Sequence, residues 1–170
     1  GSSVWWTMSD SRRSRHSVFA WRDGEVRFVR ALLSQIPRGR VWADPAQVSY
    51  DGSAMVFASQ LAVDPAFEAR TGTSAVYRLG LDGRLDCLSC LGGTRVTQPA
   101  SLGDTTVTYT GTMIDPRISR DGSTVAFQTS AGLVPADTNG SNDVYLWRDG
   151  GQTLVSNGIA LDGSGIGGPG

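Results

Sequence analysis

Two stretches of the chain repeat one pattern of polar and hydrophobic positions. Residues 118–127 (ISRDGSTVAF) match residues 48–57 (VSYDGSAMVF) in type at almost every position. In each copy an Asp-Gly pair precedes a run rich in apolar and β-branched residues, which is typical of a strand. Asp-Gly readily supplies the positive φ angles that a tight turn requires. The repeat therefore predicts two equivalent β-hairpins.

A second hairpin follows each copy, and the same hairpin occurs once before the first copy. These second hairpins turn at Asp-Gly pairs in positions 23–24, 82–83 and 149–150. Two hairpins in one repeat make four strands, which is the pattern of stacked β architectures. We predict an all-β, antiparallel fold built from four-stranded units. The predicted units are a half unit at 17–30 and whole units at about 46–90 and about 115–156.

The remaining segments lie before, within and after these units. Residues 1–16 show no alternation and are interpreted as an N-terminal lead-in, and residues 158–170 form a Gly-rich tail. Insertions at 61–74 and 132–142 separate the two hairpins of the whole units. We expect these insertions to decorate one rim of the scaffold, where binding surfaces concentrate.

Composition narrows the classes of partner. The chain has 170 residues with a formal net charge of -1, so it offers no net attraction to phosphate backbones or anionic lipids. We therefore expect neither nucleic acid nor membrane as a partner. The 22 glycines and the charged fraction of 18% favour a turn-rich β protein over a helical bundle.

Several motifs carry a resemblance to a known family. They are SRDGSTVAF (119–127), LVPADTNG (133–140), DVYL (143–146), and LDCLSC (85–90) followed by Gly93-Thr94-Arg95. Together they resemble the TolB-like, WD-type β-propeller repeats of bacterial proteins, over about residues 17–157. The resemblance implies four-stranded blades around a central channel, and it favours an extracytoplasmic or secreted location.

The number of units departs from this family pattern. The chain holds about two and a half predicted blades, whereas closed propellers have about 4 to 8. Either the chain is a piece of a longer protein, or several copies complete a ring. We therefore expect the partners to include the remaining blades of a parent propeller or further copies of the chain.

Asp137, Asn139 and Asp143 form the sharpest polar cluster. Their side-chain oxygens recur through a glycine-containing loop, and Ca²⁺ takes six to eight oxygen ligands. The alternative is a turn in which Asp and Asn side chains bond to their own backbone. Calcium is the only cofactor that the sequence suggests.

Cys87 and Cys90 are the only cysteines. In an extended strand they would point to opposite faces, so a disulfide requires the chain to turn, which the following glycines permit. The alternatives are a local disulfide in an oxidising compartment or two reduced, half-buried thiols. With His16 as the only histidine, the chain lacks the ligands for a zinc site.

No catalytic residues are predicted. The chain has no G-x-S-x-G motif, and its one imidazole, His16, lies outside the predicted units. We predict a non-enzymatic binding or scaffold module of β-propeller type that presents its rim loops to a protein partner. The alternative is the propeller portion of a larger serine peptidase or other hydrolase whose catalytic domain lies elsewhere. A third interpretation is a purely structural repeat array.

Overall fold

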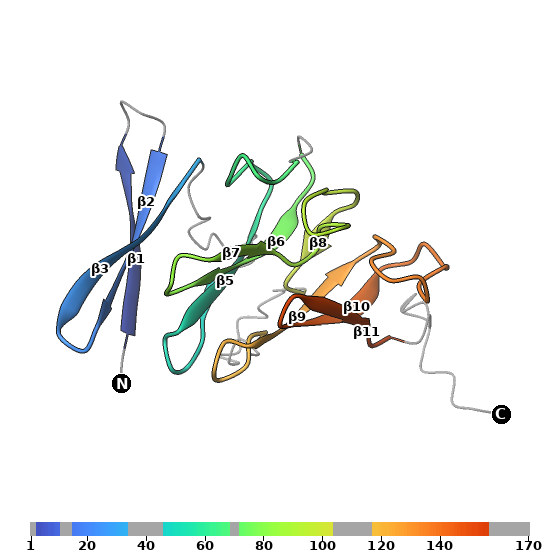
Figure 1. The fold of residues 1–170 in the computed structure, drawn as a ribbon. Helices are drawn as coiled ribbons and strands as arrows, with labels where there is room; N and C mark the ends of the chain where they lie inside the picture. The colour runs from blue at the N-terminus through green and yellow to red at the C-terminus, as the bar shows by residue number, and fades with distance from the viewer. Residues whose placement is uncertain (1–2, 11–14, 34–45, 69–71, 104–116, 157–170) are drawn as a thin grey trace, which may run out of the picture.

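Three antiparallel sheets make up the computed structural model, which describes residues 3–10, 15–33, 46–68, 72–103 and 117–156 (Figure 1). The first sheet contains β1 (Ser3–Asp10), β2 (Arg15–Arg22) and β3 (Glu25–Leu32). The middle sheet contains β4 (Gln47–Val48), β5 (Ala54–Ser59), β6 (Ala75–Gly80) and β7 (Leu85–Cys87). The last sheet contains β8 (Ala100–Ser101), β9 (Thr124–Thr129), β10 (Asp143–Arg148) and β11 (Gly151–Leu154).

This architecture confirms the predicted all-β, antiparallel class. Within the described ranges every element is a strand, so no helix there has the length and apolarity to cross a membrane. The three sheets remain separate, and the described strands close neither a barrel nor a ring. The predicted Gly-rich tail at 158–170 lies outside the described residues.

The Asp-Gly pairs turn the chain where the sequence predicts. At the β2–β3 turn Asp23 has φ 53° and Gly24 has φ 86°. At the β10–β11 turn Asp149 has φ 49° and Gly150 has φ 90°. Two successive positive φ angles characterise the type I′ turn, whose twist matches that of the strands that it joins. These turns therefore fix the register of both hairpins.

The first sheet contains a strand that the sequence analysis missed. Residues Ser3–Asp10 pair with β2 along their whole length, so the expectation of a lead-in at 1–16 is wrong for these residues. Adjacent tryptophans, Trp5 and Trp6, hide the alternation because each packs on a different face of the strand. The overlooked signal is the sequence GSSVWW (1–6), which repeats GSAMVF (52–57) and GSTVAF (122–127).

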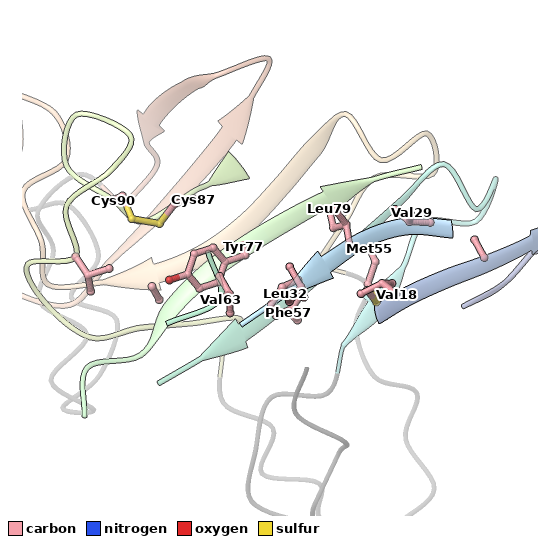
Figure 2. Packing of buried hydrophobic residues seen from close by; sticks show 13 residues of the cluster. Val18, Val29, Leu32, Met55, Phe57, Val63, Tyr77, Leu79, Cys87 and Cys90 are labelled. Carbon is pink, nitrogen blue, oxygen red and sulfur yellow. A yellow bond between two sulfur atoms is a disulfide. The ribbon is translucent and has the colours of Figure 1, made fainter. Parts of the chain in front are cut away.

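The middle sheet packs between the other two. Figure 2 shows the cluster that joins it to the first sheet, in which Val18 and Leu32 meet Phe57 and Leu79. A second cluster joins its other face to the last sheet, where Val56 and residues on neighbouring strands meet those of β9 and β10. As a result, all six residues of β5 are buried, whereas β9 alternates between buried and half-buried positions.

Two glycines show that the two interfaces between sheets are packed in the same way. Gly52 and Gly122 occupy equivalent turns, with φ of 72° and 70°. A Cβ on Gly52 would collide with Ser3, and a Cβ on Gly122 would lie 2.8 Å from the Cβ of Ala54. Ser3 and Ala54 are equivalent first residues of β1 and β5. Each turn therefore packs against the preceding sheet at a point where only glycine fits.

Candidate functional site

The sheets have two different ends. The turn end carries the short Asp-Gly turns at 23–24, 51–52, 82–83, 121–122 and 149–150. The opposite end, here called the long-loop end, carries the β5–β6 loop, the segment after β7 and the β9–β10 loop (Figure 1). Both predicted insertions, at 61–74 and 132–142, belong to the long-loop end. Because long loops on a rigid sheet scaffold are where binding surfaces concentrate, this end is the candidate site.

Backbone hydrogen bonds join two of these loops. The amide of Glu68 donates to the carbonyl of Thr94 at 2.9 Å, and the amide of Val96 donates to the carbonyl of Glu68 at 3.3 Å. The side chains of Glu68 and Arg95 form an ion pair at 3.6 Å. Phe67 packs on the buried ring of Tyr77, with 5.5 Å between the ring centroids. The β5–β6 loop and the segment after β7 therefore form one continuous surface.

An arginine ties this surface to the first sheet. Arg30 on β3 donates to the carboxylate of Asp64 at 2.5 Å and to the carbonyl of Gly83 at 2.7 Å. Partial burial raises the pKa of Asp64, but hydrogen bonds from Arg30 and the amide of Ala66 outweigh burial, so the pKa lies below its usual value. Asp64 is therefore held ionised and bonded, and the loop that carries it is fixed.

The β9–β10 loop is fixed by the hydroxyl of Tyr145. This hydroxyl donates to the carboxylate of Asp137, lies 3.3 Å from the carbonyl oxygen of Ala131, and accepts from the amide of Leu133 at 3.2 Å. Burial, followed by the hydrogen bond to Asp137, raises the pKa of Tyr145 to about 12. The phenol therefore stays protonated at neutral pH and acts as a structural donor.

Ionised groups at the long-loop end are already engaged. Its described residues include only four charged side chains, and each has a partner described above: Asp64, Glu68, Arg95 and Asp137. Two leucines protrude among them, because Leu61 is 62% exposed and Leu91 is 41% exposed. The described surface of this end therefore presents apolar side chains beside charged side chains that are paired.

The structure assigns separate partners to the three residues predicted as calcium ligands. Asp137 accepts from Tyr145, and Asn139 accepts from the amide of Ser141 at 2.7 Å. Asp143 is fully buried and accepts from the hydroxyl of Ser156. In the described part of the chain no group of three or more His, Cys, Asp or Glu side chains is placed to hold a metal ion. Calcium binding stays a prediction from the sequence.

Cys87 and Cys90 are joined by a disulfide, with 5.5 Å between their Cα atoms (Figure 2). Both side chains are at most 5% exposed. The bond closes the bend between β7 and the Gly92-Gly93 turn, where both glycines have positive φ. Buried in this way, the disulfide fixes the base of the turn that presents Leu91.

The S-x-D-G motif at the turn end has a structural role. The carboxylate of Asp121 accepts from the hydroxyl of Ser119 at 2.6 Å and from the amide of Ser123 at 3.1 Å, and Asp51 accepts equivalent bonds. These bonds, first that from Ser119, lower the pKa of Asp121 to about 2. The motif therefore closes each turn through hydrogen bonds to one oxygen of its carboxylate.

The exposed leucines of the long-loop end were not predicted from the sequence. Leu61 lies in the predicted insertion at 61–74 and Leu91 directly follows the predicted unit at about 46–90, and neither position by itself indicates whether a leucine is buried or exposed. Comparison with known proteins adds no assignment, because the chain matches no family model, no curated protein and no solved structure.

Proposed function

We propose that the chain is a non-enzymatic binding or scaffold module of β-propeller type, whose long-loop end contacts a protein partner. The observation that carries this proposal is the character of that end. Its loops are fixed by hydrogen bonds, an ion pair and a disulfide, and their described residues expose Leu61 and Leu91 beside charged side chains that each have a partner. Preorganised apolar side chains with satisfied polar neighbours suit a protein surface.

The blade interpretation is supported by equivalence between the sheets. The middle and last sheets carry the same turn motif, and each stacks its turn on the preceding sheet. An isolated stack of sheets leaves faces and edges that further blades or further chains would cover. An experimental structure of the chain tests this interpretation: successive sheets should be related by one repeated rotation. A face-to-face arrangement with no common axis would contradict it.

An extracytoplasmic location belongs to the same proposal. It is supported by the Cys87–Cys90 disulfide, since structural disulfides persist in oxidising compartments and are rare in reducing ones. Thiol alkylation of the protein isolated from its native compartment, followed by mass spectrometry, should find both cysteines protected. Free thiols in the folded native protein would contradict the assignment.

The binding role is tested with a selected partner. A displayed library of folded domains is selected against the wild-type chain, and the affinity of the recovered binders is measured for L61D/L91D and for Y50D. Tyr50 is 75% exposed at the turn end and serves as a matched control. We expect L61D/L91D to weaken binding by about 30-fold or more, because buried apolar anchors dominate such interfaces. Binders that are lost only with Y50D would contradict the proposal.

A further inference from the structure

The first sheet has an apolar face on which no described sheet packs. Pairing with β2 places alternate residues of β1 and β3 on this face, opposite the residues that pack on the middle sheet. We call it the open aromatic face, and it consists of Val4, Trp6, Met8, Phe19, Trp21, Val26 and Phe28. The exposed fractions are 56% for Val4, 59% for Met8, 62% for Val26 and 59% for Phe28.

The same face occurs twice more in the chain. Strand register makes Trp6–Phe19 equivalent to Phe57–Tyr77 and to Phe127–Tyr145. Each pair is stacked, with ring centroids 5.8, 5.6 and 5.8 Å apart, respectively. The neighbouring positions also correspond, so that Val4 matches Met55 and Val125, and Phe28 matches Cys87 and Leu154.

The exposure of equivalent residues distinguishes this face of the first sheet from the same face of the other two sheets. At the position of Val4, Met55 is 5% exposed and Val125 is fully buried. At the position of Phe28, Cys87 is 5% exposed. In the middle and last sheets the preceding sheet covers this face. In both cases the aromatic face of one sheet therefore packs on the opposite face of a similar sheet.

Among the described residues, no sheet packs on the corresponding face of the last sheet. This face consists of the half-buried residues Thr124, Ala126, Gln128 and Val144 and the exposed residue Leu146. They are equivalent to Ala54, Val56, Ala58, Val76 and Arg78, the positions at which the middle sheet meets the last sheet. Leu146, which is 37% exposed, occupies the position in the last sheet that is equivalent to Arg78 in the middle sheet. The guanidinium carbon of Arg78 lies 5.4 Å from the ring centroid of Trp147. One chain therefore carries, on its first and last sheets, the two kinds of face that pack together in both of its interfaces between sheets.

We propose that the open aromatic face binds a second copy of the chain through the uncovered face of that copy's last sheet. The contact is head-to-tail and repeats the interface between the middle and last sheets, with Leu146 of one copy packing on Trp21 of the next. Such heterologous contacts close into rings or extend into filaments. The contact surfaces are separate from the long-loop end, so the proposal rests on the blade interpretation of the proposed function and not on the binding role of that end.

Analytical ultracentrifugation over a wide concentration range tests the contact. The wild-type chain should associate, and both F28D and L146D should raise the apparent dissociation constant by at least about 100-fold, since each places a carboxylate in the apolar contact. L61D is the matched control and should associate like the wild type, because Leu61 is 62% exposed at the long-loop end. A wild-type chain that stays monomeric, or equal losses with L61D, would overturn the proposal.

Mixing the two single variants distinguishes a head-to-tail contact from a symmetric one. F28D keeps an intact last sheet and L146D keeps an intact open aromatic face, so an equimolar mixture should form a one-to-one complex and no larger species. The double variant F28D/L146D should not associate with itself. A mixture that stays monomeric overturns the proposed geometry.

A measurement on the wild-type chain needs no substitution. Trp6 and Trp21 are partly exposed on the open aromatic face, so acrylamide should quench the tryptophan fluorescence less efficiently as the protein concentration rises through the association range. We expect the quenching constant to fall by about a third or more, which is an order-of-magnitude expectation for covering two partly exposed rings. A quenching constant that is independent of association would overturn the assignment of this face.

Discussion

The middle and last sheets carry the same motif but bury it differently. Every residue of β5 is buried, whereas β9 alternates, although the two strands begin after identical Asp-Gly turns. Phe57 and Phe127 are both covered, since each faces the preceding sheet. The second face differs: in β5 it carries Ala54, Val56 and Ala58 and packs on the last sheet, whereas in β9 it carries Thr124, Ala126 and Gln128, and no described sheet follows. The more polar second face of β9 agrees with its lower burial.

The largest expected effect comes from placing a charge on that second face. V56D puts a carboxylate between the middle and last sheets, where Val56 is fully buried, and should destabilise the chain by about 4–5 kcal/mol or more. A126D, at the equivalent position on the uncovered face, should cost only about 1 kcal/mol or less. Urea unfolding at low protein concentration measures both. Equal losses would show that the second face of the last sheet is covered in the monomer.

Truncating the equivalent aromatic residues sharpens the same contrast. F57A removes a fully buried ring and should cost about 3–5 kcal/mol. W6A removes a larger ring from the partly exposed equivalent position, and it should cost only about 1–2 kcal/mol because water already reaches part of that ring. Thermal and urea unfolding of dilute samples compare the two. A larger cost for W6A than for F57A would contradict the partial exposure of Trp6.

The disulfide gives the middle sheet a cross-link that the last sheet lacks. Leu154 stands in β11 where Cys87 stands in β7. The bond closes a loop of four residues, so in the chain-entropy model it contributes about 2 kcal/mol and its loss should lower Tm by about 4–8 °C. Calorimetry with and without reductant measures this shift. The C87A/C90A variant is the control, and a reductant effect that persists there would contradict the explanation.

The smallest expected effect concerns acid stability at the turn end. The pKa of Asp121 falls from its ordinary value of 3.8 to about 2 in the folded chain. The depressed pKa contributes stability above about pH 4, and this contribution is lost as the pH falls toward 2. D121N, which keeps an acceptor oxygen without the charge, should therefore be less stable than the wild type at neutral pH. The difference in Tm should narrow between pH 4 and pH 2, and a constant difference would contradict this origin.

Much of the fold follows from local signals in the sequence. The type I′ turns at Asp23-Gly24 and Asp149-Gly150 need only two residues with accessible positive φ, which Asp-Gly supplies. The S-x-D-G repeat likewise predicts β5 and β9. The strand β4 belongs to the hairpin predicted at 48–57, whereas β8 lies at Ala100–Ser101, outside the predicted unit at about 115–156. Its pairing with β9 joins residues far apart in the sequence, which a local pattern does not encode.

The candidate site was less predictable than the fold. The positions of the insertions were visible, but the contacts that fix them join Glu68 to Thr94 and Arg30 to Asp64, which are distant in the sequence. The oxygen atoms of Asp137 suggest a calcium ligand, yet its carboxylate accepts from Tyr145, which the sequence marks only as part of the DVYL motif. Side-chain partners of this kind depend on strand register and sheet stacking, which a single sequence does not specify.

The close approach at Gly52 and Gly122 has a mechanical consequence. A rotation of one sheet on the next pivots where the backbones touch, so displacement is smallest at the Asp-Gly turns and grows along the strands. Leu61 and Leu91 lie at the opposite end of the middle sheet from these turns. They would therefore move relative to the β9–β10 loop while the turns stay in place. A ligand that bridges those loops would therefore sense the angle between neighbouring sheets, and a bulkier residue at Gly122 would reset that angle from the opposite side of the molecule.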